Sequence, residues 1–473
     1  MENKRWMNSS VLVPGMTLAM LAALSVQRGG SLAHAGTAAQ TLALAGLYTL
    51  VYGGLLAGYA LLEKPKAGAL ALVGGFAALT MIARGSMLDF VTADYTSFLS
   101  GWVELFREGG FGLLAEYVGD YNLLYQYVLL LISKSPLHDL YLIKYVTVIF
   151  DHLLALAMMR AAGVYGGEKA KLPALLLMLI LPTTLLDGAC WGQCDSVYAF
   201  LVGMSLYMLE TDRPMRSAVF LSISFAFKLQ TIFFFPVVLF GLLHKKFDWR
   251  HAAAFFAAYV VTLIPAMIAG RSFVDAVSVY ANQSMGQYYD RLTYNAPNLY
   301  LFFPMLEFAS SQEFTWMRYI QDIDAKGLNG YLNPDLFPDL QHAALYACVV
   351  LTLIVVIYWL MHWKEITPDM TLDIALFFAL FLPFVMPKIH ERYFYLADML
   401  SILYAIKYAR RRFVPLLVVG ASLMSYVPYL MRQRPIDERV LALMMLAALV
   451  IVSRDVLSRM RENRAFAAKG GVL

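Results

Sequence analysis

Charged residues are scarce in this sequence. Of its 473 residues, 15% are Asp, Glu, Lys or Arg, whereas 60% are hydrophobic. This balance excludes an ordinary soluble protein, in which about 25% of the residues are charged. No stretch is long and polar enough for a separate soluble domain, so any chemistry must lie in the loops or between helices.

Cysteine is equally rare, with only Cys190, Cys194 and Cys348. Their spacing fits neither a disulfide framework nor a zinc site. The predicted outer face also shows no set of side chains with metal-ligand spacing, so no cofactor and no metal is expected, although a divalent metal stays an open alternative. The net charge of +4 is small and concentrates in short loops and the C-terminal tail. It indicates membrane orientation, with no nucleic-acid partner. No internal repeat is recognisable, which argues against a transporter with duplicated halves.

What fills the chain instead is a series of apolar runs of about 17–22 residues. They predict an all-α polytopic membrane protein with roughly twelve to fourteen transmembrane helices, surrounded by membrane lipids. Lys4 and Arg5 place the N-terminus in the cytoplasm, so the loop after the predicted 67–83 span is extracytoplasmic. Segment 96–134 is predicted to form juxtamembrane or re-entrant helices on that side. The remaining predicted spans are about 8–27, 39–62, 139–160, 173–187, 194–210, 217–243, 251–269, 342–361, 370–386, 394–408, 413–430 and 438–453. Segment 217–243 has basic residues at both ends, which favours two short helices that break near Lys228; one long helix with a lysine inside the membrane is the alternative.

Polar clusters gather on the predicted outer face. The first holds Asp89 and Asp94, followed by Tyr95 at the start of an amphipathic segment. A carboxylate at a membrane surface costs free energy unless it has a function. Transfer to a hydroxyl acceptor needs a base beside that hydroxyl, and a carboxylate in this position can accept its proton. The alternative is a helix cap or an ordinary loop carboxylate.

Two further clusters carry aromatic and amide side chains. The segment Gly119-Asp120-Tyr121-Asn122 opens a short apolar helix, and its alternative interpretation is a turn with interfacial aromatics. The turn from Asp187 to Tyr198 contains Trp191, Gln193 and Asp195, more than a turn requires. Lys228 and Gln230 lie in an apolar run, where a lysine needs a partner such as a phosphate.

The fourth cluster is basic. Lys388, His390 and Arg392 fall within five residues, with Glu391 among them. Such a group forms an anion site, and arginine suits bidentate contact with phosphate. The alternative is a positively charged interfacial turn, although positive residues usually avoid the outer face.

As an ordered set, these motifs resemble the GT-C class of integral-membrane glycosyltransferases. The closest group is the polyprenyl-phosphate-glucose/mannose-dependent glucosyl- and mannosyltransferases and their bacterial relatives. The resemblance covers most of 80–400 and rests on Ala93-Asp94-Tyr95, Asp120-Tyr121-Asn122, Trp191-Gly192-Gln193-Cys194-Asp195-Ser196, Phe227-Lys228-Leu229-Gln230, His390-Glu391-Arg392 and the segment around Asn295 and Pro297. Two features depart from the class: three helices precede the acidic loop instead of one, and the polar turn lacks the histidines of eukaryotic members.

The resemblance implies an inverting transferase that moves one sugar, a hexose or a pentose, from a polyprenyl-phosphate donor. The acceptor would be a glycan, glycolipid or protein outside the bacterial cytoplasmic membrane, in cell-envelope synthesis. Asp94, with Asp89 as the second candidate, would be the catalytic base. The donor phosphate would be held by Lys228, His390, Arg392 and Lys388. The remaining substrate contacts would come from Tyr95, Asp120, Asn122, Trp191, Gln193, Asp195, Gln230, Glu391 and Asn295.

The resemblance also divides the chain. Residues 1–66 would be added N-terminal helices, and 67–270 a GT-C-like module whose first outer loop is 84–138. Residues 271–341 would form an extracytoplasmic loop region, and 342–473 a C-terminal membrane module with a basic cytoplasmic tail. Two other functions remain open: a transporter or flippase for a lipid-linked sugar, and a glycan polymerase.

Overall fold

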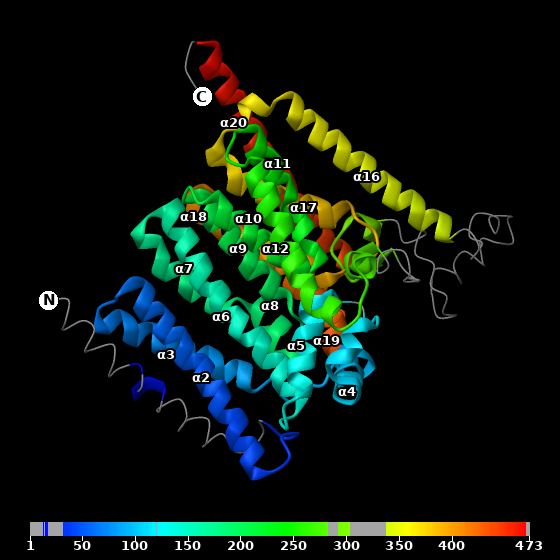
Figure 1. The fold of residues 1–473 in the computed structure, drawn as a ribbon. Helices are drawn as coiled ribbons and strands as arrows, with labels where there is room; N and C mark the ends of the chain where they lie inside the picture. The colour runs from blue at the N-terminus through cyan, green and yellow to red at the C-terminus, as the bar shows by residue number, and fades with distance from the viewer. Residues whose placement is uncertain are drawn as a thin grey trace, which may run out of the picture. The chain divides into compact units, whose positions relative to one another are not determined.

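The structure is a computed structural model that describes residues 32–119, 121–281, 292–302 and 337–469, together with Val13 and residues 15–17. These residues are almost entirely helical and include one pair of two-residue strands (Figure 1). The prediction of an all-α polytopic membrane protein is confirmed. Contacts between Cα atoms divide the chain into two units. One comprises Met1–Thr231 and Trp249–Gln283, the other Ile232–Asp248 and Ser284–Leu473.

The first unit is built around α6 (Asp139–Gly166), which is buried over most of its length. Against it pack α7 (Glu168–Ile180) and α9 (Asp195–Glu210), and α10 (Pro214–Phe227) packs against both α9 and α12 (Trp249–Ile268) (Figure 1). The other elements of this unit are α2 (Ala38–Glu63), α3 (Ala67–Gly85), the π-helical turn η1 (Tyr95–Leu99), α4 (Ser100–Gly109), the 3₁₀ turn η2 (Gly110–Ala115), α5 (Leu123–Ser133), α8 (Pro182–Thr184), the π-helical turn η3 (Leu185–Trp191) and α13 (Phe273–Val277).

Local sequence signals explain where α2 begins and ends. The Thr37 hydroxyl accepts a hydrogen bond from the Gln40 amide at 3.3 Å, and the Gln40 side chain accepts one from the Thr37 amide at 2.9 Å. This reciprocal pair is a capping box. The helix ends at Glu63. The next residue, Lys64, has a left-handed φ of 44° and precedes Pro65, which cannot continue the helix.

The segment after α3 forms short helices, as predicted. α5 has 11 residues and is therefore about 17 Å long, too short to cross a hydrocarbon core of about 30 Å. The predicted break near Lys228 is also confirmed. α10 ends at Phe227, Lys228 is extended, and the 3₁₀ turn η4 (Leu229–Phe234) leads to α11 (Phe235–Leu243).

The second unit is organised around α17 (Thr371–Val385), which is buried along nearly its whole length. It packs against α11, α18 (Tyr395–Lys407) and α20 (Glu438–Ala468). The parallel strands β1 (Thr293–Tyr294) and β2 (Ile389–His390) pair with Thr293 opposite Ile389. The remaining elements are η5 (Leu299–Phe302), α16 (Phe337–Met361), η9 (Trp363–Glu365), η10 (Pro368–Met370), η11 (Glu391–Phe394), η12 (Ala409–Arg411) and α19 (Val414–Met431).

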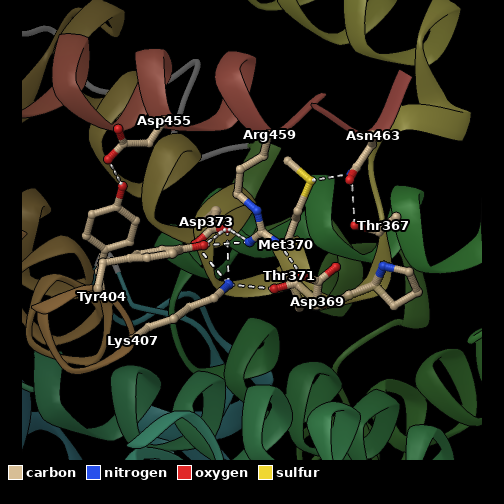
Figure 2. Close-up of polar contacts among 12 residues, drawn as sticks. Thr367, Asp369, Met370, Thr371, Asp373, Tyr404, Lys407, Asp455, Arg459 and Asn463 are labelled. Atoms are coloured by element: carbon tan, nitrogen blue, oxygen red, sulfur yellow. Dashed lines mark hydrogen bonds and ion pairs between the residues drawn. The ribbon is translucent and has the colours of Figure 1, made fainter. Parts of the chain in front are cut away.

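A network of ion pairs joins α20 to α17 and α18 (Figure 2). The buried Asp373 carboxylate accepts hydrogen bonds from Lys407 at 3.1 Å and from Arg459 and Tyr408 at 2.8 Å. Next to it, Asp455 accepts from the Tyr404 hydroxyl at 2.5 Å and from Arg411 at 2.6 Å. The arginines of the C-terminal helix therefore hold this unit together, in addition to any role in membrane orientation.

Fewer helices are long enough to cross a membrane than the sequence suggests. Among the described residues, eight helices are long and apolar enough, or nine if Glu168–Ile180 and the bent continuation Pro182–Trp191 form one span. The estimate of roughly twelve to fourteen included segments that form helices too short to cross alone, such as α10, α11 and α18. The predicted first span at 8–27 lies mostly outside the described residues.

Candidate active site

The acidic loop between α3 and η1 is fixed by a buried lysine. Lys144 on α6 is 1% exposed and donates to the carbonyl oxygens of Met87 at 3.1 Å, Leu88 at 2.8 Å and Phe90 at 2.7 Å. These bonds use all three donors of the ammonium group. The loop backbone that leads to Asp94 is therefore held against α6.

Asp89 lies within this loop and contacts the segment before α2. Its Oδ1 accepts hydrogen bonds from the Ala33 amide at 2.9 Å and from the Tyr141 hydroxyl at 2.5 Å. The Tyr141 hydroxyl also accepts from the His34 amide at 2.9 Å. This carboxylate thus ties the acidic loop to the N-terminal segment and to α6.

Asp94 stands directly before η1 and is half-buried. The indole Nε1 of Trp191 donates to its Oδ2 at 2.9 Å, and the amide Nε2 of Gln193 donates to the same oxygen at 2.7 Å. The predicted acidic loop and the predicted polar turn, about 100 residues apart in the sequence, therefore meet at one carboxylate. Two fixed donors on one oxygen hold the carboxylate in a single orientation.

The polar turn is shaped by two glycines. Gly192 has a left-handed φ of 80°, which favours glycine, and it ends the π-helical turn η3. At Gly188 an added Cβ would lie 2.9 Å from Asp151 Oδ2 and 3.0 Å from Thr147 Cγ2. The turn can approach α6 this closely only because Gly188 has no side chain.

A buried ion pair lies behind the turn. Arg84, at the end of α3, donates through Nε to Asp151 Oδ2 at 3.3 Å, and both side chains are 1% exposed. Its other nitrogens donate to the Leu179 carbonyl at 3.2 Å and to the Thr184 hydroxyl at 3.4 Å. Arg84 thus connects α3, α6 and the bend between α7 and η3, and Trp191 is the last residue of η3.

Lys228, predicted to need a charged partner, has one in Asp195. Its Nζ lies 2.6 Å from Asp195 Oδ1, and both side chains are almost fully buried. The ammonium also lies 5.9 Å from the Tyr121 ring centre and 5.8 Å from that of Tyr198, within reach of cation–π attraction. The Tyr121 hydroxyl in turn donates to Gln193 Oε1 at 2.9 Å. Lys228 is thereby linked through Tyr121 and Gln193 to Asp94.

Four more residues of this part of the chain are predicted to contact substrate: Tyr95, Asp120, Asn122 and Gln230. The Tyr95 hydroxyl donates to Asp139 Oδ1 at 2.9 Å, and burial together with the Asp139 charge raises the pKa of Tyr95. It therefore stays a hydrogen-bond donor. Asn122 is buried and caps α5, and Gln230 is buried in η4. Asp120 lies outside the described residues.

The predicted basic turn from Lys388 to Arg392 belongs to the second unit. The His390 ring stacks on Tyr294 with ring centres 4.8 Å apart, and the Lys388 amide donates to the Leu292 carbonyl at 2.8 Å. Asn295 forms an isolated bridge with His390. The Asn295 segment and the basic turn, both chosen from sequence, therefore lie together, although they are about 95 residues apart.

The other predicted residues of the basic turn are Glu391, Lys388 and Arg392. Glu391 is buried, and its Oε2 lies 3.9 Å from His390 Nδ1. Partial burial lowers the pKa of Lys388, and Lys388 has a left-handed φ of 61°. Arg392 begins the 3₁₀ turn η11 together with Glu391.

The sequence profile of glycosyltransferase family 87 matches residues 121–387, more than half of the chain. The chain belongs to glycosyltransferase family 87. No curated protein matches the sequence. Family membership shows that the protein is a glycosyltransferase, and its apolar helices show that it crosses the membrane several times.

The part of the chain that matches family 87 contains Trp191, Gln193, Asp195 and Lys228. Asp94 and the basic turn from Lys388 to Arg392 lie outside it. The contacts of Trp191 and Gln193 with Asp94 thus connect the matched part of this glycosyltransferase to the acidic loop before it.

Sequence reasoning missed Lys144 and Arg84 as supports of the acidic loop and the Trp191 turn. Lys144 lies in an apolar helix whose sequence does not show that the acidic loop passes over it. Arg84 is close to the acidic loop in sequence, but its partner Asp151 is 67 residues away. In the described ranges, no three His, Cys, Asp or Glu side chains come together as metal ligands.

Proposed function

We propose that this family 87 protein is an inverting, GT-C-like glycosyltransferase that takes one sugar from a polyprenyl-phosphate donor. The acceptor is a glycan, glycolipid or protein on the extracytoplasmic side of the bacterial cytoplasmic membrane. Asp94 is the catalytic base. Membership of a glycosyltransferase family supports sugar transfer over the alternative of sugar transport.

The observation that carries the proposal is the orientation of Asp94 by Trp191 and Gln193. A general base must stand within hydrogen-bond reach of the proton that it accepts, and its geometry matters before its pKa. Asp89 is the weaker candidate, because its Oδ1 is held by Ala33 and Tyr141 and its other oxygen, Oδ2, is buried away from any acceptor. We therefore assign Asp89 to the support of the loop.

In the proposed reaction the acceptor hydroxyl oxygen attacks the anomeric carbon of the donor. The bond between that carbon and the phosphate oxygen breaks, and its electron pair leaves with the polyprenyl phosphate. The hydroxyl proton passes to Asp94. One direct displacement inverts the anomeric centre, and the phosphate needs no general acid because it is already a good leaving group.

Positive groups are proposed to hold the departing phosphate. Lys228 is held by its pairing with Asp195 and lies near the Tyr121 and Tyr198 rings. His390, Arg392 and Lys388 supply the basic turn. Fixed charges of this kind stabilise negative charge as it develops in the transition state. Tyr95, Asn122, Gln230, Glu391 and Asn295, with Asp120, are proposed as further substrate contacts.

A comparison of donors tests this proposal. Purified protein in nanodiscs, supplied with a membrane lipid extract as the acceptor source, is given polyprenyl-phosphate hexoses and pentoses in one series and nucleotide sugars in another. We expect transfer only from the polyprenyl-phosphate series, with inversion at the anomeric carbon. Transfer from a nucleotide sugar, or retention of the donor configuration, would overturn the proposal.

A further inference from the structure

One face of the helix that begins at Asp94 carries two aromatic side chains. η1 and α4 form one continuous helix, because Asp94 and Ser100, which flank η1, both have α-helical backbone angles. Phe98 and Trp102 follow Asp94 at intervals of four residues, and side chains at this spacing lie on the same face of a helix. The ring centres of Phe98 and Trp102 are 5.9 Å apart, within the range of aromatic pairs.

The Trp102 ring is fixed by the loop that leads to α5. Gly119 lies directly against it, since an added Cβ there would be 2.5–2.7 Å from the three nearest atoms of the indole. Only glycine permits this approach. Tyr121 meets the indole edge-on, with ring centres 5.9 Å apart. The indole is therefore held in one position before any ligand binds.

Tyr121 also connects the indole to the proposed base. Its hydroxyl donates to Gln193 Oε1 at 2.9 Å, and Gln193 Nε2 donates to Asp94 Oδ2 at 2.7 Å. Side chains one helical turn apart have Cβ atoms about 5–6 Å apart, so the Phe98 ring stands next to Asp94 along the helix. A molecule whose hydroxyl group reaches Asp94 therefore lies beside the two rings.

Both rings can be reached from outside the protein. Phe98 is 48% exposed, and Trp102 is half-buried. At Gly101, directly before Trp102 in the chain, an added Cβ would meet no atom within 4 Å. The surface beside the rings is therefore open.

The charges on this helix favour a neutral polar ligand over a membrane surface. A helix that lies in a membrane interface is rich in Lys and Arg. This helix instead carries Asp94, Glu104 and Glu108 against one basic residue, Arg107, which pairs with Glu104. A sugar ring suits both features of the site: its C–H groups pack on the electron-rich face of an aromatic ring, while a hydroxyl group at its edge reaches the carboxylate.

We propose that Phe98 and Trp102 bind a sugar ring of the acceptor, with its C–H face on the aromatic side chains and the accepting hydroxyl toward Asp94. The acceptor is then a glycan or a glycolipid, and a protein side chain is excluded. This assignment rests on the proposed function, in which Asp94 is the base that accepts the proton of that hydroxyl.

Binding in the absence of a donor gives the first test. Full-length protein in phosphatidylcholine nanodiscs, free of sugar-based detergent, is mixed with methyl glycosides of several hexoses, and saturation-transfer NMR identifies the ring protons that contact the protein. We expect contact through one C–H face in wild type, in Phe98→Tyr and in the control Phe111→Leu, at a phenyl ring of η2 that is 46% exposed. Phe98→Leu and Trp102→Leu should lose it. Thermal unfolding checks that each variant is folded.

Transfer kinetics give the second test. We expect Phe98→Leu and Trp102→Leu to raise the KM for the acceptor about tenfold or more, as removal of an aromatic anchor usually does, and to leave the KM for the donor unchanged. If wild type binds the glycosides through these rings but transfers no sugar from any donor, the proposed reaction is wrong and the binding site stands.

Three results would overturn the binding site. One is that wild type does not contact the glycosides. Another is that both leucine variants contact them as wild type does. The third is that brominated phospholipid quenches the fluorescence of Trp102, measured as the difference between wild type and Trp102→Leu, because the ring would then lie in lipid.

Discussion

At the scale of single residues, the account rests on Asp94 Oδ2. Trp191 and Gln193 both donate to this oxygen, and Gln193 is itself fixed by the Tyr121 hydroxyl. Each bond can be removed separately without a large change in side-chain volume. The orientation of the carboxylate is therefore open to a direct experimental test.

Trp191→Phe removes the indole donor and keeps most of the aromatic packing. A hydrogen bond to a charged group contributes about 1.5–3 kcal/mol, so we expect the transfer rate constant to fall by about 10- to 100-fold. The KM for the donor should change little. The control is Trp249→Phe, because Trp249 is 74% exposed. Equal rates for both variants would show that the indole does not position the base.

Lys144→Met tests the support of the acidic loop. The substitution leaves the buried carbonyls of Met87, Leu88 and Phe90 without their donor. Each such loss costs about 1–3 kcal/mol, so we expect a clear fall in unfolding temperature and in the transfer rate. Lys134→Met, at an exposed lysine, is the control and should leave both unchanged. A Lys144 variant as stable and active as wild type would contradict the assigned role.

At the scale of elements, the sequence predicts structure best where polar or charged residues interrupt apolar segments. Polar motifs in apolar surroundings predicted that the acidic loop and the Trp191 turn share a function, and the structure brings them together. The basic residues at both ends of segment 217–243, Arg216 and Lys245, predicted the break near Lys228 that follows α10. The supports Lys144 and Arg84 could not be predicted, because their partners are backbone carbonyls and side chains that only the tertiary fold brings close.

The α17–α20 network supplies a prediction at this scale. Asp373→Asn removes the buried negative charge that Lys407 and Arg459 share. Breaking a buried ion pair costs about 3–5 kcal/mol, so we expect a large loss of stability in thermal or denaturant unfolding. The control is Asp437→Asn, at the largely exposed pair with Arg439, where little change is expected. Comparable stability of the two variants would refute the structural role of the network.

At the scale of the whole molecule, helix type was predicted well and helix number less well. Apolar runs identify segments that enter a membrane, but they do not show whether each segment is one span or a short broken helix. α9 and α18 illustrate this limit, since segments 194–210 and 394–408 are predicted as single spans and form helices of 16 and 13 residues. Orientation is inferred from charge, which predicts that Asp94 lies outside and that the basic C-terminal tail lies inside.

Cysteine labelling of intact cells tests this orientation. Ser97→Cys, three residues after Asp94, and Lys469→Cys, at the end of α20, both replace exposed residues. The three native cysteines are buried and should react slowly. A membrane-impermeant maleimide should label position 97 in intact cells and position 469 only after lysis. The reverse pattern would invert the topology and place the proposed site in the cytoplasm.

The most direct test of the central claim is sugar transfer by purified wild type and Asp94→Asn, with Glu104→Gln as a control at an exposed acid. Each protein is assayed in nanodiscs with the best polyprenyl-phosphate sugar and a membrane lipid extract. Loss of a general base lowers rates by about 10²–10⁴-fold, and we expect a loss of this size for folded Asp94→Asn alone. Equal product from wild type and Asp94→Asn would contradict the assignment and direct attention to Asp89.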